Sequence, residues 1–121
     1  MKNKIVIIDD NVVFTQAMVF LLEIYKNIDI LVYNNAIDFC NDYSNNWCGV
    51  LLIDLFMPKL DGFSLLTELK KRNNKMYTIA ISGHADKNAR KRAHELGATE
   101  FLFKPFNTNQ FLEKLHQYKI I

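Results

Sequence analysis

Residues 50–62 read V-L-L-I-D-L-F-M-P-K-L-D-G, an apolar run that ends at Asp54 and leads into a loop containing one proline and one glycine. A run that is apolar on consecutive residues, and not on alternating ones, is typical of a strand covered on both faces, as in a parallel sheet. Four more short runs of this kind occur at residues 5–8, 30–33, 77–81 and 101–103. The sequence therefore predicts five buried strands.

Helical patterns fill the gaps between these runs, with apolar residues recurring at spacings of three and four. The five predicted faces are Phe14, Ala17, Met18, Leu21, Leu22 and Tyr25; Ala36, Phe39, Cys40 and Tyr43; Leu65, Leu66 and Leu69; Ala89, Ala93 and Leu96; and Phe111, Leu112, Leu115 and Tyr118. Strands that alternate with helices predict an α/β fold, a doubly wound parallel sheet with right-handed crossovers.

Residues at the ends of the helical patterns suit capping roles. Asn35 precedes the second pattern, and Asn107 or Thr108 precedes the fifth, as helix N-caps do. Gly97 follows the fourth pattern, where a left-handed residue often ends a helix.

Val13, Phe20 and Ile24 lie off the main apolar face of the first helix. We expect the neighbouring fifth helix to bury them, with a dimer patch as the alternative.

Length and composition limit the classes of protein that the chain can represent. Its 121 residues suit one domain without a second folded unit, and 50% hydrophobic residues exclude disorder. A net charge of +2 does not favour nucleic-acid binding. Cys40 and Cys48 have no metal or redox spacing, and no apolar run approaches the length of a signal peptide or membrane helix. We expect a cytoplasmic protein that binds neither membranes nor DNA directly.

The residues that follow the predicted strands carry chemistry. Asp9 and Asp10 follow the first strand, Asp54 the third, Ser82 the fourth and Lys104 the fifth. Ligands of open α/β sheets bind outside the carboxyl ends of the strands, so these side chains are expected at one edge. A single Asp there is usually a helix cap, but three carboxylates about 5 Å apart repel by roughly 3 kcal/mol per pair and need a cation. Oxygen ligands favour Mg²⁺, and the site indicates phosphate chemistry.

Four segments together resemble the receiver domains of two-component response regulators, the CheY-like family. They are residues 7–11 (I-I-D-D-N), 52–62 (L-I-D-L-F-M-P-K-L-D-G), 81–83 (I-S-G), and 97–106, which begins G-A and ends F-K-P-F. The resemblance covers nearly the whole chain. It implies one receiver domain over residues 1–121, with five helices around a flavodoxin-like, five-stranded sheet of strand order 2-1-3-4-5.

The resemblance also implies a role for each matching residue. Asp54 is the phosphoacceptor, and Asp9, Asp10, Asp54 and the backbone carbonyl of Phe56 hold Mg²⁺, or Mn²⁺ in its place. Ser82 and Lys104 bind the phosphoryl group, Phe101 changes rotamer, the bond before Pro105 is cis, and Phe56 and His84 tune the phosphoryl lifetime. Many family members have tyrosine at the position of Phe101, so a hydroxyl is missing here.

A receiver of this kind is a signalling switch and not an enzyme in the usual sense, although it assists its own Mg²⁺-dependent phosphorylation and dephosphorylation. The implied phosphoryl donor is a histidine kinase or a histidine phosphotransfer protein. The implied output is a downstream effector protein or a second copy of the chain, bound through the fourth helix, fifth strand and fifth helix.

Three other functions compete with this hypothesis. An aspartate-nucleophile phosphatase of the haloacid dehalogenase type needs a second acid two residues after the nucleophile, where this chain has Phe56. A flavodoxin needs a phosphate loop rich in Gly, Ser and Thr after the first strand, where this chain has Asp9, Asp10 and Asn11. A pseudo-receiver with a structural role is disfavoured because every site position is filled.

Overall fold

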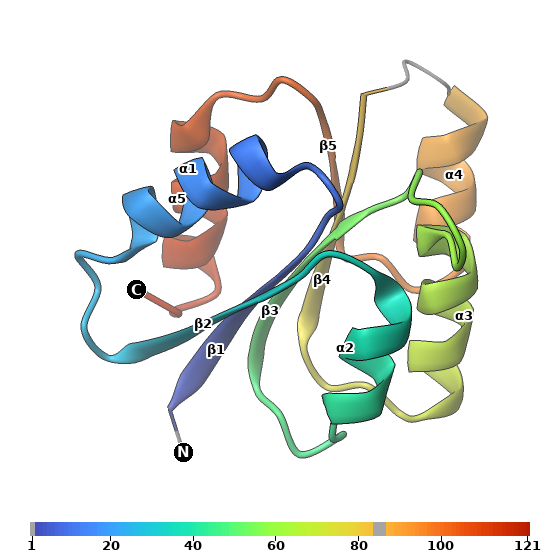
Figure 1. Ribbon diagram of the computed structural model, residues 1–121, viewed down its shortest axis with the longest axis horizontal. Coiled ribbons are helices and arrows are strands. Elements are labelled where there is room, and N and C mark those ends of the chain that lie inside the picture. The colour runs from blue at the N-terminus through green and yellow to red at the C-terminus, as the bar shows by residue number, and fades with distance from the viewer. Residues whose placement is uncertain (1, 84–86) are drawn as a thin grey trace.

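The computed structural model describes residues 2–83 and 87–121, and over these residues strands and helices alternate throughout (Figure 1). The elements are β1 (Asn3–Ile8), α1 (Val12–Leu22), β2 (Ile28–Tyr33), α2 (Ala36–Asp42), β3 (Gly49–Asp54), α3 (Gly62–Lys71), β4 (Tyr77–Ser82), α4 (Lys87–Glu95), β5 (Glu100–Phe103) and α5 (Thr108–Gln117). Each apolar run predicted as a strand lies inside one of these strands, so the prediction is confirmed.

The strands form one parallel sheet in the order β2-β1-β3-β4-β5. This is the strand order that the family resemblance implied. β3 is the central strand, and all six of its residues are buried. Its partners are β1, where Ile8 pairs with Ile53, and β4, where Ile81 pairs with Asp54. The carboxyl ends of β1, β3 and β4 therefore meet at one edge of the sheet.

Helices cover both faces of the sheet, with α1 and α5 on one side and α2, α3 and α4 on the other (Figure 1). Alternate residues of the central strands point into two separate cores. Ile5, Ile7, Val50 and Leu52 pack with Met18, Leu22 and Phe111 in one core, and Val6, Ile8, Leu51 and Ile53 pack with Phe39, Leu65 and Leu66 in the other. Burial on both faces explains why these strands are apolar on consecutive residues.

The predicted helix ends are found at the expected residues. The Asn35 side chain accepts a hydrogen bond from the Asp38 N–H at 2.8 Å, and Asn107, not Thr108, caps α5 by accepting from the Asn109 N–H at 2.9 Å. Gly97 has a φ of 103°, a left-handed conformation that suits the residue after a helix. None of the helices in the described part of the chain is long and apolar enough to cross a membrane.

The expectation that α5 buries the outer side of α1 is wrong. Val13, Phe20 and Ile24 are 78%, 82% and 71% exposed. The segment V-V-F-T-Q-A-M-V-F-L-L contains no charged residue and only two polar ones, Thr15 and Gln16, so apolar side chains occupy more than one side of α1. It turns Met18 and Leu22 towards the sheet, which leaves the opposite apolar side in solvent.

The start of α3 lies unusually close to the end of β3. A Cβ atom added to Gly62 would lie 2.6 Å from the Leu55 Cα and 2.7 Å from the Asp54 carbonyl oxygen. The Gly62 N–H also donates to the Leu55 carbonyl at 3.0 Å, and Asp61 caps the helix by accepting from the Ser64 N–H at 2.8 Å. This contact fixes the backbone that carries Asp54.

We predict that Gly62→Ala destabilises the fold by about 1–3 kcal/mol, because an extra carbon between two backbones forces one of them to move. Chemical denaturation monitored by circular dichroism measures the loss. Gly83→Ala is the matched control, since nothing lies within 4 Å of the added carbon. Equal stabilities of the two variants would contradict the close approach.

Candidate functional site

Three carboxylates meet where β1 and β3 end side by side. Asp9 follows β1 and Asp54 ends β3; they are 1% and 7% exposed, whereas Asp10 is exposed to solvent. One carboxylate oxygen from each of the three residues lies within 4.8 Å of the others. The sequence-based expectation that these residues converge at one edge is confirmed.

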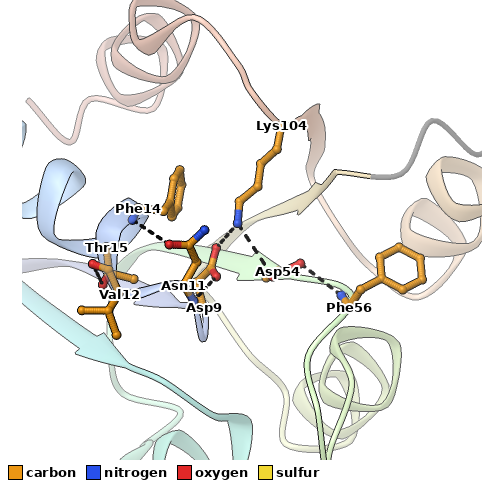
Figure 2. Close-up of polar contacts among 8 residues, drawn as sticks. All are labelled: Asp9, Asn11, Val12, Phe14, Thr15, Asp54, Phe56 and Lys104. Atoms are coloured by element: carbon orange, nitrogen blue, oxygen red, sulfur yellow. Dashed lines mark hydrogen bonds and ion pairs between the residues drawn. The ribbon is translucent and has the colours of Figure 1, made fainter.

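Lys104 brings an amine into the same pocket from the segment that follows β5 (Figure 2). Its Nζ lies 2.5 Å from Asp9 Oδ2 and 3.8 Å from Asp54 Oδ2, and its side chain is only 19% exposed. Its backbone N–H donates to the Ser82 carbonyl at 2.7 Å, so the end of β4 holds the lysine in place. One ammonium thus faces two buried carboxylates.

Backbone amides orient the two buried carboxylates in the same way. Asp9 Oδ1 accepts from the Asn11 N–H at 2.9 Å, and Asp54 Oδ1 accepts from the Phe56 N–H at 3.1 Å (Figure 2). In each case the amide comes from the residue two positions later and binds Oδ1. The Oδ2 atoms of both residues are the ones that face Lys104.

The surroundings of Asp54 disfavour its charged form. The pKa of Asp54 is raised from 3.8 to about 6, mainly by burial and also by the nearby Asp9 and Asp10 charges, against the lowering effects of the Phe56 amide and Lys104. Burial and charge–charge repulsion together raise the pKa by more than the Lys104 ammonium and the Phe56 amide lower it. The cluster therefore favours gain of a further positive charge.

The donor set fits Mg²⁺. The ion takes oxygen ligands at about 2.0–2.1 Å in an octahedron, so ligands on opposite sides lie about 4.2 Å apart. Carboxylate oxygens from Asp9, Asp10 and Asp54 within 4.8 Å of one another match that size after a small adjustment. Their hardness and charge suit Mg²⁺ or Mn²⁺ better than softer metals.

The remaining predicted site residues surround this cluster. Ser82 is fully buried at the end of β4, one residue beyond the partner of Asp54. The Lys104–Pro105 peptide bond is cis, as the resemblance implied. The Phe56 ring is 42% exposed at the lip of the pocket, and packs edge-on against Phe63 with 5.9 Å between ring centroids. His84 lies outside the described residues.

Phe101 lies on β5 and is 7% exposed, so its ring is turned into the protein. It packs edge-on against Phe103 with 4.9 Å between centroids, and the Arg90 guanidinium lies 6.0 Å from each ring. These contacts connect β5 with α4.

Sequence reasoning missed one neighbour of the pocket. The Phe14 ring lies beneath the Lys104 ammonium, with 4.3 Å from Nζ to the ring centroid. The helical spacing places Phe14 on the inner side of α1 and predicts only a core residue. Its position four residues after Asp10, in the first turn of the helix, was the available signal.

We predict that Asp54→Asn stabilises the metal-free protein by about 1–2 kcal/mol near pH 7.5, after allowing for solvent at the pocket rim. The folded-state pKa of Asp54 exceeds its unfolded value, so its favourable contribution is complete below pH 3.8 and is lost as the pH rises through about 6. The stability gained by Asp54→Asn should therefore nearly vanish at about pH 4, where Asp54 itself is neutral in the folded protein.

Urea denaturation in the presence of a chelator at both pH values measures this difference. Asp29→Asn is the control, because the Asp29 side chain is 41% exposed and lies at the opposite end of the sheet beside Lys2 and Lys4. An Asp54→Asn gain that is the same at both pH values would rule out the raised pKa.

Comparison with known proteins identifies the family. The sequence-family model of the response regulator receiver domain matches residues 5–116 of this chain. The response regulator protein TodT of Pseudomonas putida is 31% identical over 108 residues, which make up 89% of this chain and 47% of TodT. This chain therefore spans about half the length of the curated relatives it matches.

Solved structures agree with the sequence relatives. The response regulator StyR superposes with a TM-score of 0.87 at 26% identity, over 97% of this chain and 59% of StyR. The non-phosphorylated HemR receiver domain from Leptospira biflexa gives a TM-score of 0.86 at 27% identity, over 96% of this chain and 93% of that domain. With its fold, its acidic pocket and these matches, the chain belongs to the family of response regulator receiver domains.

Proposed function

We propose that the chain is a phosphoaspartate receiver in which Asp54 accepts a phosphoryl group from a histidine kinase or a histidine phosphotransfer protein. The observation that carries this proposal is the position of Asp54 Oδ2. It lies 3.8 Å from the Lys104 ammonium, in a pocket whose other carboxylates are Asp9 and Asp10. Residues 1–121 would then act as one cytoplasmic receiver domain.

The chemistry requires an in-line attack by the Asp54 carboxylate on phosphorus. The new O–P bond forms while the P–N bond to the donor histidine breaks, and the product is an acyl phosphate. A carboxylate is a weak nucleophile, so the reaction depends on in-line positioning of the carboxylate and on neutralisation of the negative charge on the phosphoryl oxygens. Lys104 supplies one positive charge at the right place.

Mg²⁺ would be held by Asp9, Asp10, Asp54 and the backbone carbonyl of Phe56, and when bound it neutralises charge on the phosphoryl oxygens. The residues around it have their own tasks. The amides of Asn11 and Phe56 keep Asp9 and Asp54 oriented. The exposed Phe56 ring borders the mouth of the pocket, and with His84 it would set how fast water reaches the acyl phosphate.

The switch would begin at Ser82, whose hydroxyl donates to the new phosphoryl group. Movement at Ser82 would reach β5 through the bond from the Lys104 N–H to the Ser82 carbonyl, and so affect Phe101. The Phe101 ring lies against Arg90, and Arg90, Lys91 and His94 line a hollow of about 360 Å³ on this side. We infer that the surface of α4, β5 and α5 carries the output to an effector protein or a second copy.

The rival phosphatase hypothesis lacks its general acid. A haloacid dehalogenase places a second carboxylic acid two residues after the nucleophile, and here that residue is Phe56, whose ring packs on Phe63. A phenyl ring cannot donate a proton to a leaving group. The site therefore supports transfer to Asp54 and slow hydrolysis better than rapid phosphatase turnover.

We predict that acetyl phosphate with Mg²⁺ adds one base-labile phosphoryl group to Asp54, because residues 54–62 match the phosphoacceptor segment of the family and Asp54 Oδ2 faces the Lys104 ammonium in the acidic pocket. Intact-mass spectrometry after mild acid quenching measures the addition. Asp54→Asn should abolish it, and Asp29→Asn should leave it unchanged. Undiminished labelling of Asp54→Asn would contradict the assignment of Asp54 as the phosphoacceptor.

We also predict that Mg²⁺ stabilises the fold by RT ln(1 + [Mg]/Kd), about 2.7 kcal/mol at a hundredfold excess over Kd, because it relieves carboxylate repulsion. Thermal unfolding with and without the ion measures the effect. Asp10→Ala should remove most of it, since Asp10 is the exposed ligand, and Asp29→Ala should not. A melting temperature that does not respond to Mg²⁺ would count against the metal site.

A further inference from the structure

The Phe14 ring occupies a fixed place beside the pocket. The backbone N–H of Phe14 donates to Asn11 Oδ1 at 3.0 Å, and the Asn11 N–H in turn donates to Asp9 Oδ1 at 2.9 Å. The ring packs edge-on against Phe106 with 5.9 Å between centroids and an interplanar angle of 79°. One hydrogen-bonded chain therefore ties the ring to the carboxylate that pairs with Lys104 (Figure 2).

The face of this ring is turned to the ammonium. Lys104 Nζ lies 4.3 Å from the ring centroid, well inside the distance of about 6 Å at which an aromatic ring attracts a cation. The lysine side chain is only 19% exposed, so little water screens the attraction. Phe106, which supports the ring, follows Lys104 by two residues, so the same loop delivers both the cation and the support.

The carboxylate contacts of Lys104 cannot all persist during phosphoryl transfer. Asp9 and Asp54 are the partners of the ammonium in the free protein and are also the residues that would hold the metal and the phosphoryl group. A lysine side chain has four flexible carbon–carbon bonds and many rotamers. Of these three partners only the ring is not engaged by the metal or the phosphoryl group, so its share in holding the ammonium is larger in the phosphorylated state than in the free protein.

We propose that Phe14 is a positioning residue for Lys104, holding the ammonium at the pocket through its aromatic face while the anionic partner changes from carboxylate to phosphoryl group. The proposal rests on the proposed phosphoacceptor function. A leucine at position 14 would fill the same apolar space but would lack the negative face of the ring. Burial alone does not explain the aromatic residue, because Phe14 is only half-buried.

The first experiment replaces Phe14 by monofluoro-, difluoro- and trifluorophenylalanine, which progressively remove the negative charge of the ring face with little change in shape. The dissociation constant of beryllofluoride, a phosphoryl mimic, is measured by calorimetry in the presence of Mg²⁺. We expect it to rise with each fluorine, by about three- to tenfold over the series. The same series at Phe111, which is fully buried next to Phe106, is the control and should be flat.

The second experiment needs no phosphoryl chemistry. A double-mutant cycle with Phe14→Leu and Lys104→Met measures unfolding of the metal-free protein. We expect Phe14→Leu to lower the folded-to-unfolded ratio about three- to tenfold more when Lys104 is present than when methionine replaces it. A purely structural Phe14 gives the same loss in both backgrounds.

A flat fluorination series at Phe14, or no coupling in the cycle, overturns the proposal. If the parent protein does not bind beryllofluoride, the phosphoacceptor function fails, and the stability cycle alone then decides whether the ring holds the ammonium. Dependence on fluorination at Phe14 together with coupling to Lys104 establishes it.

Discussion

The structure depends on confining three carboxylates and one ammonium at the ends of two adjacent buried strands. Asp9 and Asp54 are nearly inaccessible to water, and at such sites like charges repel strongly unless a cation compensates them. The Lys104 ammonium offsets part of that repulsion, and the pKa of Asp54 is still raised, first by burial and then by the Asp9 and Asp10 charges. We expect such a pocket to gain stability when it takes up a divalent cation.

The parallel sheet is what makes this arrangement possible. Because β1 and β3 are neighbours and run in the same direction, the residues that follow them come together although they are far apart in sequence. The packing of Gly62 against Asp54 and Leu55 fixes the loop on one side, and the Asn11 cap fixes α1 on the other. The same sheet that buries the apolar runs therefore also sets the geometry of the charged edge.

Much of this could be predicted from the sequence because strand burial leaves a local signature. Residues 50–53 are apolar in succession since both of their faces are covered, and the acids directly after such runs had to share an edge. The outer side of α1 was predicted wrongly, because a helix without charges has no polar stripe to show which side faces solvent. The contact of Phe14 with Lys104 joins segments 90 positions apart, and the position of Phe14 in the first turn of the helix indicates a place near the pocket but does not identify its partner.

In the proposed function, this pocket receives a phosphoryl group on Asp54. A crystal structure of the protein with Mg²⁺ and beryllofluoride tests it most directly. We expect beryllofluoride attached to the Asp54 carboxylate, Mg²⁺ bound by Asp9, Asp10, Asp54 and the Phe56 carbonyl, and the Lys104 ammonium in contact with fluoride while still over the Phe14 ring. A pocket without beryllofluoride at saturating concentration, or one in which Lys104 stays paired with Asp9 and makes no contact with fluoride, would contradict it.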